Sequence, residues 1–263
     1  MKELTVYEKK EKNGIPGGIS AGISFTAAVI LLCAVCALTW GIGRFAARGS
    51  VVSVSHEQNT VIYPPTVVID AGHGGMDGGA SGADGTVEKE INLAVAKRLD
   101  LLLNLSGIEC VMTREEDRML VEDDVKEHRK MHDLKNRLAV AEEISENGGN
   151  SVLVSIHMNN FSSPKYYGLQ VWYSGNNPDS SQLASYVQSY AATFLDTTNK
   201  REIKRATSSI YILDRATVPA VLVECGFLSN SEECAKLKSE PYQTELAVTM
   251  FSALCQWMGN AEA

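Results

Sequence analysis

Residues 66–75 read Thr-Val-Val-Ile-Asp-Ala-Gly-His-Gly-Gly, an apolar run that ends at an aspartate and continues into a glycine-rich loop. Such a run is typical of a buried strand, and the glycines that follow interrupt regular structure. We therefore predict a strand over residues 66–70 and a loop over residues 71–87, with His73 shortly after the strand. A residue in this position stands at the carboxyl end of a strand, where α/β enzymes keep their chemistry.

Two later stretches repeat this arrangement. The run SVLVSIH ends at His157, and the run AVLVE ends at Glu224. Glu88 follows the glycine-rich loop and opens a helical pattern. Two histidines and a glutamate form the ligand set of a catalytic zinc site with one position open for water, and a second glutamate can move the proton of that water. His73, Glu88, His157 and Glu224 are therefore candidates for such a site.

Each candidate also has an ordinary structural explanation. A histidine in a glycine loop or at a strand end is often hydrogen-bonded to a neighbour without binding a metal. Glu88 and Glu90 both lie near a helix start, where an acidic side chain favours the helix dipole. Glu224 is harder to explain in this way, because a carboxylate buried after an apolar run needs a partner or a metal. A dinucleotide-binding loop is excluded because Asp77 stands where a third glycine is required.

Strands alternate with helical patterns along the chain, which indicates an α/β domain with a sheet that is at least partly parallel. Asp133 is expected to cap the second helix of the domain, and Asn230 and Glu233 to cap the first helix of the tail. Further strands are expected at residues 108–113, 151–157, 169–173, 210–213 and 220–224, and helices at residues 89–105, 133–146, 178–195 and twice from Ser231 onward.

The cysteines do not suggest a metal cluster, because Cys110, Cys225, Cys234 and Cys255 have no CxxC spacing. Strand alternation predicts that Cys225 faces away from Glu224, so a thiol nucleophile beside Glu224 is not expected. A Cys234–Cys255 disulfide between the tail helices is one of several pairings, and the sequence selects none.

Composition excludes some classes of partner. Apolar residues make up 44% of the chain and charged residues 21%, values of an ordinary globular protein. The formal net charge of −8 argues against nucleic acid, since phosphate binding requires neutralisation by Lys and Arg. His128 and His132 are four residues apart, but they lie in a charge-dense segment, which favours a solvated helix face over a metal site.

Residues 19–43 contain no charged side chain and exceed the roughly 20 residues that span a bilayer. A cleaved signal peptide would have a shorter apolar core and a clearer cleavage site, so we favour an uncleaved transmembrane anchor. Four lysines precede the span, which favours a short cytoplasmic segment at residues 1–18. Residues 44–65 then form a linker, and a domain at residues 66–260 lies outside the membrane.

Three motifs resemble those of a known family in their order and approximate spacing. DAGHGGMDGGASGADGTVEKEINLAVA, SIHMNNF and PAVLVECGFLSN are similar to motifs of the zinc-dependent N-acetylmuramoyl-L-alanine amidases of the amidase-3 family. This resemblance implies a single globular domain with a mixed twisted β-sheet flanked by helices. The implied substrate is peptidoglycan, in which the enzyme hydrolyses the amide between the lactyl group of N-acetylmuramic acid and L-alanine.

Carried over residue by residue, the resemblance implies that His73, Glu88 and His157 bind Zn²⁺ and that Glu224 is the catalytic carboxylate. It also selects Glu88 over Glu90, because the ligand of the family is the glutamate of the Glu-Lys pair at the helix start.

The stretches DLKNRLAVAEE, KYYGLQVWYS and NNPDSSQLA resemble the sporulation-associated amidases of the CwlD type. That resemblance implies action on spore cortex peptidoglycan, where removal of stem peptides allows muramic-δ-lactam to form. Asp214 departs from the pattern, because many members of the family carry a basic residue there. A protein activator remains open, as do two other functions: a different zinc hydrolase of the wall polymer, and a non-catalytic binding protein with the same fold.

Overall fold

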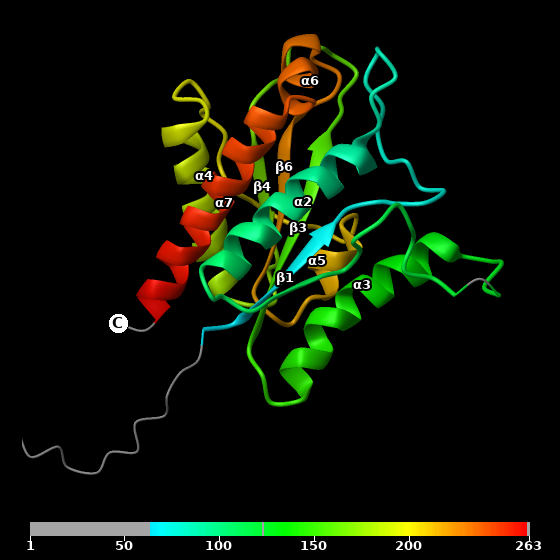
Figure 1. Ribbon diagram of the computed structural model, residues 1–263, viewed down its shortest axis with the longest axis vertical. Coiled ribbons are helices and arrows are strands. Elements are labelled where there is room, and N and C mark those ends of the chain that lie inside the picture. Colours follow the sequence, from blue (N-terminus) through cyan, green and yellow to red (C-terminus); the bar gives the residue numbers. More distant parts are fainter. Residues whose placement is uncertain (1–63, 123, 262–263) are drawn as a thin grey trace, which may run out of the picture. The chain divides into compact units, whose positions relative to one another are not determined.

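The computed structural model describes residues 64–122 and 124–261, which form an α/β domain around a six-stranded mixed sheet (Figure 1). The strand order is β2-β1-β3-β6-β4-β5, with β4 antiparallel to β6 and every other neighbouring pair parallel. The predicted α/β domain with a mixed sheet is thereby confirmed. The strands are β1 (Thr66–Ala71), β2 (Cys110–Met112), β3 (Ser151–Asn159), β4 (Gln170–Tyr173), β5 (Lys204–Arg205) and β6 (Ala220–Phe227).

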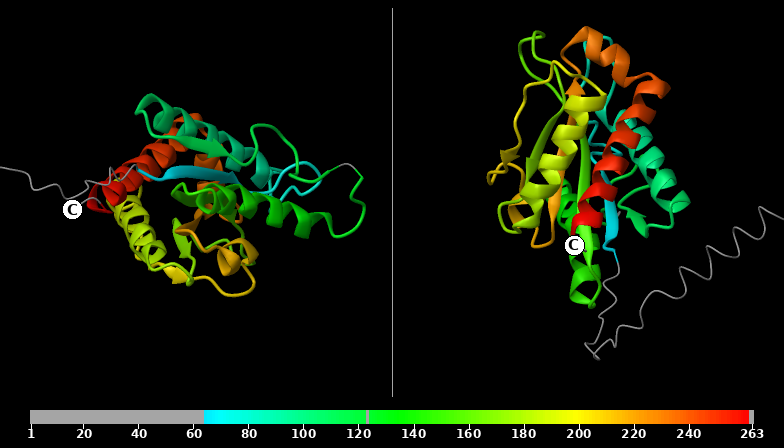
Figure 2. Two further views of the ribbon diagram at one scale, coloured as in Figure 1. Left: turned by 90° about the horizontal axis from the view of Figure 1, so that it is seen from below. Right: turned by 90° about the vertical axis from the view of Figure 1, so that its left-hand side faces the viewer.

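Helices cover both faces of this sheet. Apolar residues of α2, α4 and α7 form one core with one face, and those of α3 and α5 form a second core with the other face. The left view of Figure 2 shows α2 and α7 on one side of β1 and α3 and α5 on the other. The helices are α2 (Glu88–Leu105), α3 (Arg129–Glu146), α4 (Asp179–Phe194), α5 (Tyr211–Arg215), α6 (Ser231–Leu237) and α7 (Glu240–Ala261).

Strand alternation decides which side chains reach the functional face. In β6, Val223 and Cys225 belong to the core beneath α2, α4 and α7, whereas Leu222 belongs to the core beneath α3 and α5. Glu224 shares the face of Leu222, because side chains two residues apart point to the same side of a strand. The prediction that Cys225 faces away from Glu224 is thus confirmed, and burial raises the pKa of the Cys225 thiol.

Two local predictions were wrong. Residues 210–213 were expected to form a strand, but Tyr211–Arg215 is the short helix α5, which packs Ile212 and Leu213 against the sheet. A short apolar run does not distinguish a strand from a buried helical turn. Asp133 does not cap α3, which begins at Arg129, because the Asp133 carboxylate is buried and pairs with Arg137 one turn later.

The predicted cap of α6 is half correct. Asn230 accepts hydrogen bonds from the backbone N–H groups of Glu232 and Glu233, as expected of an N-cap residue. The Glu233 carboxylate does not return to the cap, because it accepts hydrogen bonds from the N–H groups of Phe227 and Gly168.

All four cysteines of the described part are free thiols, so the Cys234–Cys255 pairing is absent from it. The predicted segments 1–18 and 19–43, and residues 44–63 of the predicted linker, lie outside the described residues. Within residues 64–122 and 124–261, no helix has both the length and the apolar character required to cross a bilayer.

Candidate metal centre and active site

Three of the predicted site residues meet at the carboxyl ends of the central strands. His73 lies in the loop after β1, Glu88 is the first residue of α2, and His157 lies near the end of β3. One nitrogen or carboxylate oxygen from each lies within 4.8 Å of those of the other two. Glu88 Oε2 is 3.3 Å from His73 Nε2, and Glu88 Oε1 is 3.0 Å from His157 Nδ1. Groups separated by many residues therefore converge on one point.

Two buried arginines fix the loop that carries His73. His73 has a φ of 61°, in the left-handed region that costs a non-glycine residue about 1–2 kcal/mol. Arg137 donates hydrogen bonds to the carbonyl oxygens of His73 and Ala71, at 2.7 and 2.8 Å. Arg114 donates to the carbonyl oxygens of Ala71 and Gly72, at 2.7 and 3.0 Å. These contacts offset the strain and hold the imidazole in one position.

Arg137 is in turn fixed by buried carboxylates. Its guanidinium contacts Asp70 and Asp133, each at 2.8 Å, and all three side chains are almost fully buried. Ser155 donates a hydrogen bond to the second oxygen of Asp70 at 2.6 Å. Burial opposes ionisation of Asp70, but the charge of Arg137 and the hydrogen bond from Ser155 outweigh it and lower the pKa of Asp70 to about 2.

Glu88 is the most constrained of the three clustered residues. Its carboxylate accepts hydrogen bonds from the backbone N–H groups of Ala80 and Met158 and from the Asn92 amide. Although burial opposes ionisation, contacts with His157 and His73 hold the pKa of Glu88 well below its usual range. Glu88 is therefore an ionised acceptor aimed at both imidazoles.

Glycines allow the loop to approach these side chains. A Cβ atom at Gly72 would lie 2.3 Å from the His157 ring, and one at Gly79 would lie 2.5 Å from Glu88 Oε2. No side chain other than hydrogen fits at either position without displacing the cluster.

Glu224 stands opposite His157 in the β3–β6 register, on the same face of the sheet. Its Oε2 atom is buried and has no hydrogen-bond partner within the described part of the chain. Burial raises the pKa of Glu224 to about 7, and the neighbouring Glu88 carboxylate contributes to this rise. Both Glu224 and His157 line a cavity of about 230 Å³ between the sheet, α3 and α5. Glu224 can therefore bind or release a proton inside a pocket.

The other candidate residues do not join this cluster. Glu90 is exposed, as are His128 and His132. Asp214 lies on α5, where its carboxylate is 3.4 Å from Nε of the adjacent Arg215. Asp214 is not among the residues that line the cavity.

Sequence reasoning missed the supports of the cluster. Asp77 Oδ2 lies 2.9 Å from His73 Nδ1 and 3.1 Å from the Lys130 ammonium group. The i,i+4 spacing of Asp133 and Arg137 indicates a helical ion pair, but a spacing cannot reveal that the pair is buried beneath His73.

The donor set suits a divalent metal ion. Two imidazoles and one ionised carboxylate are the ligands of His₂Glu zinc sites, which leave a position open for water. Glu224 lines the same cavity, and its Oε2 atom has no hydrogen-bond partner within the described residues. The cluster therefore fits a catalytic metal centre.

Comparison with known proteins agrees with this geometry. A family model described as N-acetylmuramoyl-L-alanine amidase matches residues 67–256. The germination-specific N-acetylmuramoyl-L-alanine amidase of Bacillus subtilis (strain 168) is 33% identical over 193 residues, covering 73% of this chain and 78% of that protein.

Two solved structures extend the likeness to the fold. The CwlD amidase from Clostridioides difficile, in complex with the GerS lipoprotein, has a TM-score of 0.69 at 38% identity, covering 74% of this chain and 99% of that chain. The catalytic domain of CwlV, from Bacillus (Paenibacillus) polymyxa var. colistinus, has a TM-score of 0.61 at 30% identity, covering 74% and 98%. The chain therefore belongs to the N-acetylmuramoyl-L-alanine amidase family.

Proposed function

We propose that this amidase is zinc-dependent, with His73, Glu88 and His157 as metal ligands and Glu224 as the general base. The observation that carries this proposal is the convergence of the three ligand-type side chains to within 4.8 Å, with Glu224 paired in register with His157. The bond cleaved is the amide between the lactyl group of N-acetylmuramic acid and L-alanine of peptidoglycan.

When bound at this cluster, zinc supplies positive charge that lowers the pKa of water and polarises the amide carbonyl. Glu224 accepts the proton of the water that attacks the carbonyl carbon. As the carbon–nitrogen bond breaks, Glu224 donates that proton to the departing amine of L-alanine. Its position on a rigid strand, without another hydrogen-bond partner in the described residues, leaves it available for both transfers.

His73 and His157 present nitrogens to the ion while the surrounding protein fixes their rings. Asp77 lies beside His73, and Arg137 and Arg114 hold the backbone on which His73 stands. A metal-binding histidine whose position is fixed by its neighbours loses less freedom on binding the ion.

We further propose that the enzyme acts on spore cortex peptidoglycan, where peptide removal precedes muramic-δ-lactam formation. The similarity to a germination-specific amidase and to a CwlD amidase supports this role. The related amidase structure contains a lipoprotein, which supports a protein partner for this chain as well. Its anchoring by residues 19–43, with the catalytic domain outside the cytoplasmic membrane, is part of the same proposal.

Products of digestion test the reaction. The full chain, loaded with zinc in detergent, is incubated with purified cortex and with vegetative wall, and the new ends are identified by mass spectrometry. We expect free L-alanine amino termini and muramic acid residues without peptide. New ends inside the stem peptide would instead identify an endopeptidase, and absence of new ends would favour the non-catalytic alternative.

Metal content tests the ligand assignment. His157→Ala should lose stoichiometric zinc in elemental analysis, because it removes one of three ligands. His132→Ala is the matched control and should keep zinc, since His132 is exposed on α3. Stoichiometric zinc in the His157→Ala variant would contradict the assignment.

A further inference from the structure

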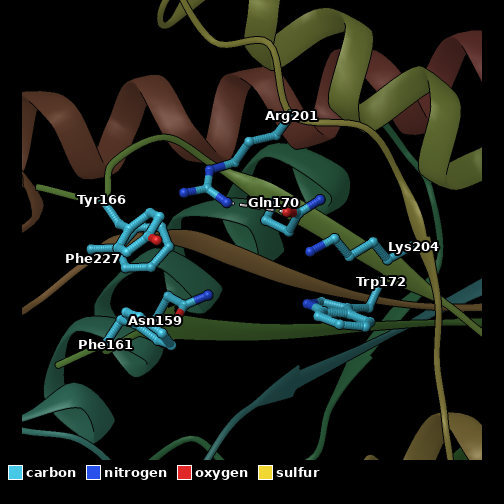
Figure 3. A pocket seen from close by; sticks show the side chains of 8 residues that line it. All are labelled: Asn159, Phe161, Tyr166, Gln170, Trp172, Arg201, Lys204 and Phe227. Atoms are coloured by element: carbon cyan, nitrogen blue, oxygen red, sulfur yellow. Dashed lines mark hydrogen bonds between the residues drawn. The ribbon is translucent and has the colours of Figure 1, made fainter. Parts of the chain in front are cut away.

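A second pocket, of about 330 Å³, lies on the catalytic face of the sheet (Figure 3). Its floor includes Asn159 of β3, Gln170 and Trp172 of β4 and Phe227 of β6. The pocket adjoins the proposed catalytic site, because Gln170 of β4 pairs in register with Glu224 of β6. The pocket therefore begins about one strand spacing, roughly 5 Å, from the proposed general base.

Two cations enter this pocket without a carboxylate partner. The Arg201 guanidinium lies 4.6 Å from the Phe227 ring centroid, and the Lys204 ammonium lies 5.2 Å from the Trp172 ring centroid. Neither forms an ion pair with an acidic side chain of residues 64–122 or 124–261. In the view of Figure 3 the two side chains reach toward Gln170 from opposite sides.

Arg201 is held in place rather than free in solvent. Its Nε donates a 2.7 Å hydrogen bond to the Tyr167 carbonyl oxygen, and its Nη1 donates to Gln170 Oε1 at 3.3 Å. Gln170 is almost fully buried and also donates to the carbonyl oxygen of Glu202. These bonds use only part of the guanidinium, and Nη2 has no hydrogen-bond partner in the described residues.

The nearby Glu233 does not neutralise this pair of cations. Arg201 acts on the Glu233 carboxylate electrostatically, but the two do not form an ion pair, because the oxygens of Glu233 accept hydrogen bonds from the N–H groups of Gly168 and Phe227. Two positive charges beside aromatic walls, with no carboxylate in direct contact among the described residues, attract an anion. This arrangement contrasts with the net charge of −8 of the chain.

We propose that this pocket binds a carboxylate-bearing residue of the stem peptide, an inference that rests on the proposed amidase function. An extended peptide advances about 3.3 Å per residue, so the charged residue lies within about three residues of the scissile amide. Arg201 provides the planar donor pair that suits a carboxylate, and Lys204 provides a second positive charge. The aromatic walls formed by Trp172 and Phe227 reduce access of water to that contact.

The test uses two muropeptides that differ only in the peptide carboxylates, which are free in one and amidated in the other. With the zinc-loaded full chain, we expect kcat/KM to be roughly tenfold or more higher for the free acid, the magnitude of a charged hydrogen bond. Arg201→Gln and Lys204→Gln should each raise KM for the free acid, leave kcat within about twofold, and hardly change hydrolysis of the amidated substrate. Arg201→Lys should restore part of the difference, because it keeps the charge.

Lys200→Gln is the matched control, because it removes the same charge one residue away from Arg201, and Lys200 is not among the residues that line the pocket. We expect it to behave like the wild type. Equal hydrolysis of both substrates by the wild type, or equal loss on both in the Arg201 and Lys204 variants, would overturn the carboxylate assignment while amidase activity stands.

Calorimetry separates this inference from the proposed function. The Glu224→Gln variant should bind the free-acid muropeptide more tightly than the amidated one, whether or not the wild type cleaves it. Carboxylate-dependent binding without any hydrolysis would contradict the proposed function alone, and indifference to the carboxylates would contradict the pocket assignment alone.

Discussion

The cluster of His73, Glu88 and His157 lies on the same face of the sheet as the second pocket, but the two are built differently. We call the second pocket, lined by Trp172, Phe227, Arg201 and Lys204 among others, the aromatic–cationic pocket. The supports of the cluster are buried and multiply bonded: Arg137 is 1% exposed and contacts two carboxylates and two carbonyl oxygens. The rim of the pocket is open, with Phe161 52% exposed and Tyr166 39% exposed. Reacting groups require fixed positions, whereas groups that first meet a polymer must remain accessible.

The largest expected effect concerns the reacting group itself. Glu224→Gln keeps nearly the same shape and removes the ability to accept a proton, so hydrolysis should slow by a factor on the order of 10²–10⁴. Zinc content and muropeptide binding should remain, because the three proposed ligands are unchanged. Parallel measurement of kcat and bound zinc checks this.

The result also decides between two roles for Glu224. A fall in zinc together with activity would make Glu224 a fourth ligand. Near-normal hydrolysis by a zinc-loaded Glu224→Gln enzyme would end the general-base proposal, and Asp77 would be the next carboxylate to test because it lies beside His73.

The second prediction removes a support of the cluster. Arg137→Ala leaves Asp70 and Asp133 buried without their cation, which should lower the free energy of unfolding by about 3–5 kcal/mol. Lys204→Gln, in the aromatic–cationic pocket, should change it by less than about 0.5 kcal/mol, because Lys204 is exposed and forms no ion pair with the described residues. Urea denaturation of both variants measures the contrast. Similar losses of unfolding free energy in the two variants would show that both regions contribute equally to the stability of the fold, contrary to this prediction.

The buried ion pairs of Arg137 with Asp70 and Asp133 predict that the free energy of unfolding depends on pH. The folded pKa of Asp70 is about 2, below the ordinary value of 3.8, so Asp70 stabilises the fold fully above about pH 4. That contribution, of about 2 kcal/mol, is lost as the pH falls from about 4 toward 2. The difference in unfolding free energy between the wild type and Asp70→Asn should therefore shrink over this range. A difference that is the same at pH 5 and pH 2.5 would contradict the depressed pKa.

The predictions from sequence were most accurate where a local pattern of residues indicates one kind of structure. Apolar runs located β1, β3 and β6, and the polar residues near their ends led to His73, His157 and Glu224, which the structure places together. They were least accurate for side chains whose role depends on contacts with residues distant in the sequence. Nothing local to Arg114 indicates that it holds the carbonyl oxygens of residues 71 and 72.

The aromatic–cationic pocket was missed for a related reason. Arg201 precedes the short edge strand β5 and Lys204 begins it, and charged residues in such positions are ordinarily solvent-exposed. The pairing of β5 with β4, and of β4 with β6, brings them toward Glu224. The strand predicted at residues 210–213 was wrong for a different reason, because a short apolar run fits a buried helical turn as well as a strand.

The smallest predicted effect tests how the aromatic–cationic pocket is held. Asn230 caps α6, and the first turn of α6 carries Glu233, which accepts hydrogen bonds from the N–H groups of Phe227 and Gly168 at the edge of the pocket.

Asn230→Ala should lower the unfolding free energy by about 1 kcal/mol, the usual value for an N-cap. Glu233 of α6 bonds to the edge of the pocket, whereas no hydrogen bond or ion pair joins α6 to His73, Glu88 or His157 in the described residues. The loss should therefore appear as a higher KM for the free-acid muropeptide, with kcat and zinc content unchanged. Asn230→Asp is the matched control, since aspartate caps a helix about as well as asparagine and should preserve both stability and KM. A fall in kcat or in bound zinc in Asn230→Ala would show that the pocket and the metal centre respond to α6 as one unit, contrary to the contrast drawn between them.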